Sequence, residues 1–147
     1  MGDSVDNHIN LVKICVGAEH VEDLLAWQGQ PRAKGPDGKP RHVTRMRPKQ
    51  DSALLNGGSL YWVFKGMILC RQRIERLDDV EGSDGILRCG IVLDPAVHRT
   101  RPVPKRPFQG WRYLKQDDAP EDLRASQPSE QALPPEMMAA LADIGVI

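Results

Sequence analysis

Basic side chains interleaved with aromatic rings are the residues of this chain best suited to chemistry with a ligand. Cations neutralise the phosphates of a nucleic acid, and aromatic faces stack on its bases. One basic stretch, from Arg32 to Lys49, contains a single acid, Asp37, and a second stretch runs from Arg99 to Lys115. If the fold brings the two stretches together, they form a nucleic-acid surface. The candidate binding residues are Arg41, His42, Arg45, Arg47, Lys49, Tyr61, Trp62, Arg71, Gln72, Arg73, Trp111 and Arg112.

The same residues also have a purely structural interpretation. Lys plus Arg and Asp plus Glu each number 20, so the net charge is zero and the arginines can pair with acids. Tryptophan rings commonly anchor cores. Gln72 is placed by alternation beside Cys70 and Ile74, and a buried amide needs hydrogen-bond partners. Those partners are either backbone groups or the polar edge of a ligand, and the sequence leaves both readings open.

No motif predicts catalysis. The four histidines have no metal-ligand spacing with a cysteine or a carboxylate. The chain also lacks a phosphate-binding glycine loop and a nucleophile motif. Whether the protein is an enzyme is therefore uncertain, and no metal or cofactor is predicted. The three cysteines, which lie inside apolar runs, are expected to be small buried side chains; they are Cys15, Cys70 and Cys89.

The length of 147 residues and the hydrophobic content of 40% predict a single domain over residues 1–147. Within it, the prolines and glycines of segment 30–40 predict a flexible basic loop. No apolar run approaches the roughly 20 residues that span a bilayer, so no membrane partner is expected. The acidic N-terminus lacks the basic start of a secretory signal. The expected location is the cytoplasm.

Hydrophobic periodicity predicts most of the secondary structure. Two apolar faces indicate a central strand over 8–16, and the spacing of Val21, Leu24 and Gln28 indicates a helix over 19–28. An edge strand is expected over 41–47 and a short helix over 49–55. The clearest strands are 59–65 and 67–77, which form a hairpin at Lys65-Gly66.

The register of this hairpin is left open by the sequence. A two-residue turn pairs Phe64 with Met67 and Trp62 with Leu69. A three-residue turn pairs Trp62 with Cys70 instead. Since a shift of one residue moves every side chain to the other face, the surface of the hairpin depends on this choice.

The second half of the chain gives weaker signals. An acidic loop is expected around Asp78, Asp79, Glu81 and Asp84, followed by a strand over 86–93. The prolines of 98–107 predict an extended or irregular segment, and an aromatic knot follows near Gly110. One helix is expected to begin at Asp118, and a last helix is expected over 134–144. The predicted fold class is α+β, with a small curved mixed sheet or a partly open barrel and packed helices.

Several segments together resemble a known family. They are residues 10–17, 21–24, 44–49, 57–63, 71–73, 93–95 and 106–114, which include the sequence Arg106-Pro107-Phe108-Gln109-Gly110-Trp111-Arg112-Tyr113-Leu114. They are similar to a family of short alphaproteobacterial proteins known as domain-of-unknown-function family 1489. The resemblance covers nearly the whole chain. It implies a bacterial origin but no activity.

A second resemblance concerns architecture. A short helix, Gly57-Gly58, an aromatic strand and a glycine turn are similar to the centre of PUA-like domains, including the ASCH and EVE branches. This resemblance implies a PUA-like barrel that binds RNA or a modified base. The leading hypothesis is therefore a nucleic-acid-binding domain. The alternatives are an enzyme acting on nucleotides or a modified base, and a protein-interaction module that uses residues 102–107 and the last helix.

Overall fold

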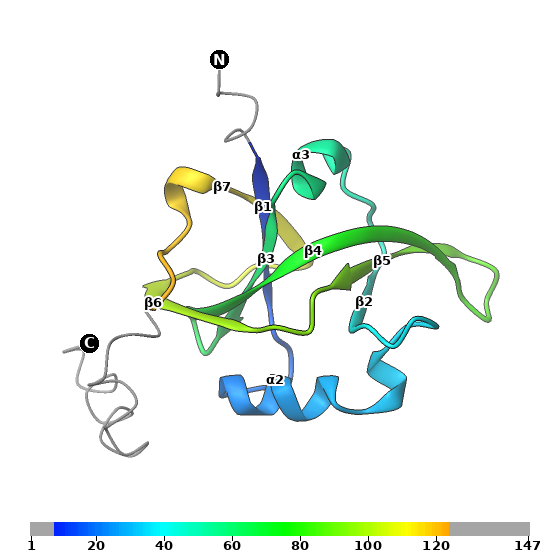
Figure 1. The fold of residues 1–147 in the computed structure, drawn as a ribbon, viewed down its shortest axis with the longest axis horizontal. Helices are drawn as coiled ribbons and strands as arrows, with labels where there is room; N and C mark the ends of the chain where they lie inside the picture. The colour runs from blue at the N-terminus through cyan, green and yellow to red at the C-terminus, as the bar shows by residue number, and fades with distance from the viewer. Residues whose placement is uncertain (1–7, 124–147) are drawn as a thin grey trace.

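The computed structural model describes residues 8–123, so the predicted helix over 134–144 lies outside the described residues. Within them the chain forms one curved sheet with two α-helices (Figure 1). The elements are β1 (Ile9–Ile14), α2 (Val21–Gln28), the 3-10 turn η1 (Pro31–Ala33), β2 (Arg41–Thr44), α3 (Asp51–Leu55), β3 (Ser59–Phe64), β4 (Met67–Glu81), β5 (Leu87–Leu93), β6 (His98–Pro104), β7 (Trp111–Lys115) and the 3-10 turn η2 (Gln116–Asp118).

The sheet is mixed and open. Its strands follow the order β2-β5-β4-β3-β1-β7, and β6 pairs with the first part of β4. β1 runs parallel to β3 and antiparallel to β7, so it is an interior strand, as its two apolar faces predict. β2 pairs only with β5 and is an edge strand, as predicted. The predicted α+β class with a curved mixed sheet is confirmed.

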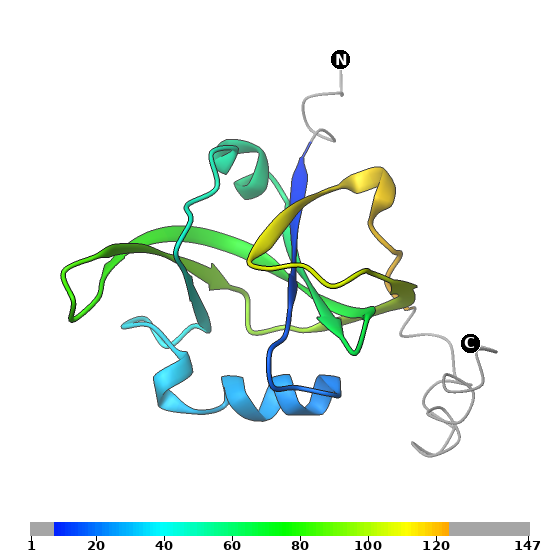
Figure 2. The same ribbon diagram turned by 180° about the vertical axis from the view of Figure 1, so that it is seen from behind.

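The two helices lie at opposite ends of β1 and β3 (Figures 1 and 2). α2 begins after His20, where Asp23 Oδ2 accepts the His20 backbone N–H at 3.0 Å and satisfies a free donor. The helix buries Val21 and Leu24 against the sheet. α3 buries Leu54 in the same core. Each helix therefore covers one end of the curved sheet.

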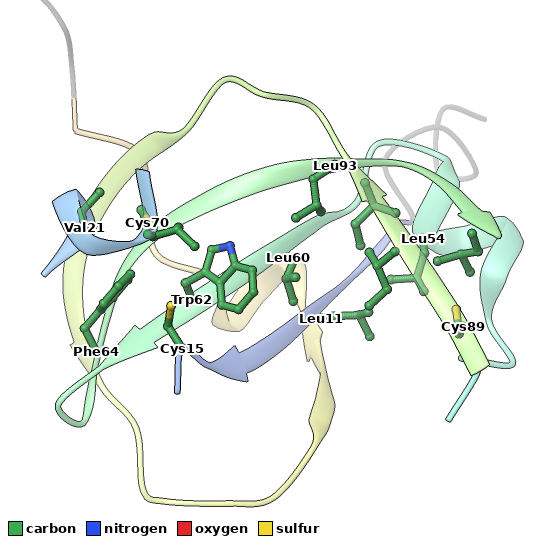
Figure 3. Close-up of a cluster of buried hydrophobic side chains, with 14 residues drawn as sticks. Leu11, Cys15, Val21, Leu54, Leu60, Trp62, Phe64, Cys70, Cys89 and Leu93 are labelled. Atoms are coloured by element: carbon green, nitrogen blue, oxygen red, sulfur yellow. The ribbon is translucent and has the colours of Figure 1, made fainter. Parts of the chain in front are cut away.

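Apolar side chains from both helices and from one face of the sheet form the main core (Figure 3). The largest side chains of its strands are Leu11, Leu60, Trp62, Phe64 and Leu93. A second cluster on the opposite face contains Val12, Tyr61, Val63, Ile68 and Leu114. The sheet is thus covered on both faces, which explains why β3 is buried along its whole length.

The cysteines belong to the apolar interior, as predicted. All three are buried and unpaired. Burial raises the pKa of the Cys15 thiol to about 11 and that of the Cys70 thiol to about 12. Both thiols therefore stay protonated and pack as small apolar groups.

The hairpin of β3 and β4 combines the two registers that the sequence leaves open. The turn is the two-residue pair Lys65-Gly66, with positive φ at both positions, and Phe64 pairs with Met67. A bulge beyond this pair shifts the ladder, so that Trp62 lies opposite Cys70. The extra residue of a bulge interrupts the two-residue period, and sequence alternation does not reveal it.

A segment predicted as a loop and a segment predicted as extended or irregular are both strands. β4 continues to Glu81 and pairs with β5, so it contains Asp78, Asp79 and Glu81. The prediction that these three residues lie in a loop is wrong. Segment 98–104 is β6. Its prolines, Pro102 and Pro104, are tolerated because β6 lies off the main strand order and the backbone bonds on its other edge use Arg99 and Arg101.

The chain after β6 also differs from expectation. The aromatic segment near Gly110 contains a strand, β7, rather than an irregular knot. The predicted helix start at Asp118 is wrong, since Asp118 ends η2 and residues 119–123 are not helical. The Glu121 carbonyl and the Leu123 N–H instead bond to the backbone of β6 at 2.9 and 2.8 Å. These bonds use backbone groups that a helix would need.

Candidate nucleic-acid interface

The two basic stretches of the chain meet where the loop after β2 crosses β7. The Trp111 indole N–H donates to the Met46 carbonyl at 2.9 Å. The backbone N–H groups of Lys49 and Gln50 donate to the Tyr113 hydroxyl at 2.9 and 3.0 Å. The indole N–H of Trp111 and the hydroxyl of Tyr113, both on β7, therefore fix the loop that residues 45–50 form. This loop carries three of the predicted binding residues, namely Arg45, Arg47 and Lys49.

A buried polar network fixes two other predicted residues, Trp62 and Gln72. Trp62 is only 3% exposed, and its indole N–H donates to Gln72 Oε1 at 2.9 Å. The side-chain amides of Gln72 and Gln28 donate to each other at 2.7 and 2.8 Å, and Gln72 also donates to the Asp94 carbonyl. Trp62 therefore lies at the base of the site rather than on its surface. The Gln72 amide has the structural partners that a buried amide requires.

A cavity of about 270 Å³ lies beside this network, between the end of α2, η1 and β2. We call it the tryptophan pocket. Its lining residues, which are aromatic, basic or uncharged, are Trp27, Gln28, Arg32, Ala33, Pro40, Arg41, His42, Val43 and Trp62. No carboxylate from the described residues lines it. Such a pocket suits a planar ring attached to an anionic group.

Trp27 gives the tryptophan pocket an accessible aromatic face. Its side chain is 43% exposed. The Arg32 guanidinium carbon lies 5.2 Å from the centre of the Trp27 ring, within the range of a cation–π contact. A stacking face and a cation are thus presented side by side at the rim of the pocket.

His42 contributes an uncharged ring to the same pocket. Its ring meets Trp62 edge-on, with centroids 5.3 Å apart. Burial, reinforced by the charge of Lys13, lowers the pKa of His42 to about 4. Its Nε2 atom is buried and has no hydrogen-bond partner in the described part of the chain. At neutral pH the His42 ring therefore places no charge in the pocket.

The cations that line the tryptophan pocket, Arg32 and Arg41, and those of the loop after β2 differ in how they are paired. Arg47 pairs with Asp79 at 3.0 Å. Arg32, Arg45 and Lys49 form no ion pair within residues 8–123. Arg41 is also without an ion pair there, but its side chain lies close to Gly35 and Gly90. Unpaired cations retain their charge for an external anion.

The remaining predicted residues lie outside the tryptophan pocket. Tyr61 pairs with Arg71 across β3 and β4 and belongs to the second cluster. Arg71 forms a bidentate ion pair with Asp122. Arg73 is exposed on β4, and Arg112 of β7 lies over Phe108 at 5.5 Å. Of the predicted residues, only Arg41, His42 and Trp62 line the tryptophan pocket, and only Tyr61 and Arg71 line a separate cavity.

The sequence interpretation missed two residues that shape the pocket. Trp27 is not among the predicted binding residues, and Arg32 is named there only as the start of a basic stretch. A tryptophan just beside the apolar stripe of α2, followed five positions later by an arginine, is the signal that could have identified them.

Residues 8–123 contain neither a membrane-spanning helix nor a cluster of metal-binding side chains. No helix in this part of the chain has both the length and the apolar character needed to cross a membrane. The same residues contain no group of three or more His, Cys, Asp or Glu side chains that could hold a metal ion.

Fold and cavity together define a small α+β protein with an aromatic-lined pocket and unpaired cations at its rim. The chain belongs to the family described as "Protein of unknown function (DUF1489)", whose model matches residues 11–147. The family resemblance of the sequence is thereby confirmed. No curated protein and no solved structure matches the chain significantly. The functional argument therefore rests on the geometry of the site.

Proposed function

We propose that this protein binds RNA, or a modified base within it, through the tryptophan pocket. A base stacks on Trp27, and the adjoining phosphates lie on Arg32 and Arg41, the two cations that line the pocket. The observation that carries this proposal is the composition of the cavity, which combines tryptophan rings with arginines and has no carboxylate among its described lining residues.

The chemistry of the pocket favours an uncharged ring with anionic neighbours. A neutral His42 places no charge against a stacked base. The exposed face of Trp27 offers stacking, which contributes about 1–3 kcal/mol per base in single-strand binding. Unpaired cations attract the phosphates and release counterions. Together these features fit a single-stranded segment better than a rigid duplex, because only an unstacked base can enter the pocket.

The proposal includes a PUA-like fold and a cytoplasmic location. The PUA-like assignment is supported by the succession of α3, Gly57-Gly58, β3, a two-residue turn and β4, in the order on which the resemblance rests. An experimental structure whose sheet superimposes on such domains would test this part of the proposal.

An enzyme acting on nucleotides or a modified base is the second candidate. That hypothesis predicts a polar pocket near Tyr61, Gln72 and Arg45. Tyr61 lines a polar cavity, whereas Gln72 and Arg45 do not line it. Stabilisation by small nucleotides, without stabilisation by RNA, would favour this candidate over the first. The protein-interaction hypothesis depends partly on Met137, Leu141 and Ile144, which lie outside the described residues.

Replacing Trp27 by alanine is expected to weaken binding of a short single-stranded RNA by about fivefold to a hundredfold, because one stacking platform is lost. Fluorescence anisotropy at several salt concentrations measures this change. The wild-type affinity should fall as salt rises, with a slope of about 0.7 per neutralised phosphate.

Leu25→Ala is the matched control for this experiment. Leu25 lies on the same helix and is 44% exposed, but it does not line the tryptophan pocket. Its replacement should leave the affinity unchanged. Absence of binding at low salt, binding without salt dependence, or equal losses in both variants would contradict the proposal.

A further inference from the structure

A second cavity, of about 350 Å³, lies beside Tyr61. We call it the Tyr61 cavity. It is lined by polar residues from both ends of the described chain, among them His8, Asn10, Ser59, Arg71, Gln116 and Asp122. The β3 residue Tyr61 has its side chain in the second apolar cluster, whereas Trp62 lies in the main core, so the two cavities belong to opposite faces of the sheet.

Tyr61 presents an unused donor to this cavity. The residue is only 4% exposed, and its hydroxyl makes no hydrogen bond within residues 8–123, although it lines the cavity. Burial raises the pKa of Tyr61, so the hydroxyl keeps its proton at neutral pH. The hydroxyl therefore faces the cavity with its proton free for an acceptor there.

Neighbouring side chains add further donors. Ser59 Oγ accepts an N–H from Arg71 at 2.8 Å, which leaves its own proton for another acceptor. Gln116 Oε1 accepts from Asn10 Nδ2 at 3.0 Å and lies 2.8 Å from His8 Nε2. Because the side-chain oxygen of Gln116 already has these partners, only its amide N–H groups remain to donate to a ligand. The cavity is therefore rich in donors.

Arg71 is the cation of this cavity, and its guanidinium group is already paired with a carboxylate of the same chain. Its Nε and one terminal nitrogen donate to the two oxygens of Asp122 at 2.7 and 2.6 Å. This fork-to-fork geometry is the one by which arginine recognises carboxylate and phosphate ligands. The pair holds the pKa of Asp122 below its usual range, so the carboxylate is charged at neutral pH.

Asp122 lies on a segment with few attachments. Residues 121–123 are held by two backbone hydrogen bonds to β6 and by an ion pair of Arg101 and Glu121 at 3.5 Å. Both side chains of that ion pair are largely exposed, and such pairs contribute little to stability. The segment can therefore leave Arg71 without disturbing the core.

We propose that the Tyr61 cavity is a binding site for a small oxyanion, a phosphate or carboxylate group, and that Asp122 occupies the ligand's place on Arg71 when the site is empty. The ligand takes the guanidinium fork of Arg71 and accepts hydrogen bonds from the Tyr61 and Ser59 hydroxyls and the Gln116 amide. Asp122 then competes with the ligand for the Arg71 guanidinium. This site is independent of the tryptophan pocket.

The experiment compares the wild-type protein with Asp122→Asn, which keeps the size of the side chain and removes its charge. Inorganic phosphate and acetate are titrated separately by calorimetry at constant ionic strength. The variant is expected to bind at least one of them about tenfold or more tightly than the wild type, because a neutral amide competes for the Arg71 guanidinium more weakly than a carboxylate does. Phosphate alone, acetate alone or both identify the oxyanion class that the site accepts.

Three further variants make the test specific. Glu121→Gln removes the neighbouring carboxylate of the cavity, which does not contact Arg71, and should leave the affinity near the wild-type value. Tyr61→Phe and Arg71→Lys, each combined with Asp122→Asn, should lose the gain. If Arg71→Lys fails to fold, the Tyr61→Phe combination still decides the question.

The proposal is overturned if Asp122→Asn binds neither anion more tightly than the wild type, or if Glu121→Gln produces the same gain. It is also overturned if Tyr61→Phe leaves the gain intact. RNA binding by these variants should follow the wild type, since Trp27 and Arg32 are unchanged. Failure of this site is therefore distinguishable from failure of the tryptophan pocket.

Discussion

Gly58→Ala is expected to destabilise the protein by at least about 3 kcal/mol, because the new methyl group has no room. A Cβ at this position would lie 2.2 Å from the Ile9 carbonyl oxygen and 2.6 Å from the Leu54 carbonyl oxygen. Both obstacles are backbone atoms, so relief requires β1 or α3 to move. The Gly58 backbone also bonds to α3 and β4: its N–H donates to the Leu54 carbonyl, and its carbonyl accepts from the Ile74 N–H.

Urea denaturation followed by circular dichroism measures the change in the free energy of unfolding. Gly29→Ala is the control, since a Cβ there would meet its nearest atom at an ordinary 3.5 Å and the φ of −75° suits alanine. This control should change stability by less than about 1 kcal/mol. Similar stabilities of the two variants would contradict the close packing of β1, α3 and the start of β3.

Replacing His42 by leucine is expected to remove a pH-dependent loss of stability. The pKa of His42 is about 4 in the folded protein, below the ordinary 6.5 expected when the chain is unfolded. The unfolded chain therefore binds the proton more readily. The contribution of neutral His42 to stability is complete above about pH 6.5 and is lost as the pH falls through about 4. The full loss is about 3 kcal/mol.

Urea denaturation at about pH 7 and about pH 4 tests this prediction. The wild type should lose about 3 kcal/mol more than His42→Leu over this interval. Carboxylates also lose stabilising interactions on acidification, but they do so in both proteins. His98→Gln, which replaces an exposed histidine on β6, should retain the wild-type difference. Parallel pH profiles for the wild type and His42→Leu would contradict a buried, neutral His42.

Local hydrophobic periodicity was sufficient to predict the elements whose pattern lies within their own segment of the sequence. The two apolar faces of 9–14, the helix stripe of Val21 and Leu24, and the hairpin at Lys65-Gly66 all appear where predicted. Each of these signals arises within about ten residues of sequence. The same holds for β2 as an edge strand.

Elements defined by distant partners were harder to predict. β6 contains prolines that argue against a central strand, and only its pairing with β4 makes it part of the sheet. β7 is held by β1, about a hundred residues earlier in the chain. The bulge near Trp62 depends on how β4 fits both β3 and β6. None of these pairings produces a recognisable pattern within a short stretch of sequence.

The candidate site shows the same division. The residue types were predicted, but the stacking role was placed on Trp62, which is buried, and on Trp111, and not on Trp27, which is exposed. Alternation within β3 separates Tyr61 from Trp62 onto different faces, so one predicted surface became two cavities. Charge pairing could not be predicted either, since the partner of Arg71 is Asp122, 51 positions away.

The central claim is that a nucleobase stacks on Trp27, and the three tryptophans of the chain permit a direct measurement. In a proton–nitrogen correlation spectrum, each indole N–H gives one signal. The indoles of Trp62 and Trp111 already donate to Gln72 and Met46, which makes these two signals internal references. Trp27→Phe assigns the third signal.

Titration with a short single-stranded RNA at low salt is expected to shift the Trp27 indole signal strongly, to leave the Trp111 signal nearly unchanged, and to lose its effect as salt is raised. A Trp27 signal that stays in place at saturating RNA, or a shift confined to Trp111, would contradict binding at the tryptophan pocket.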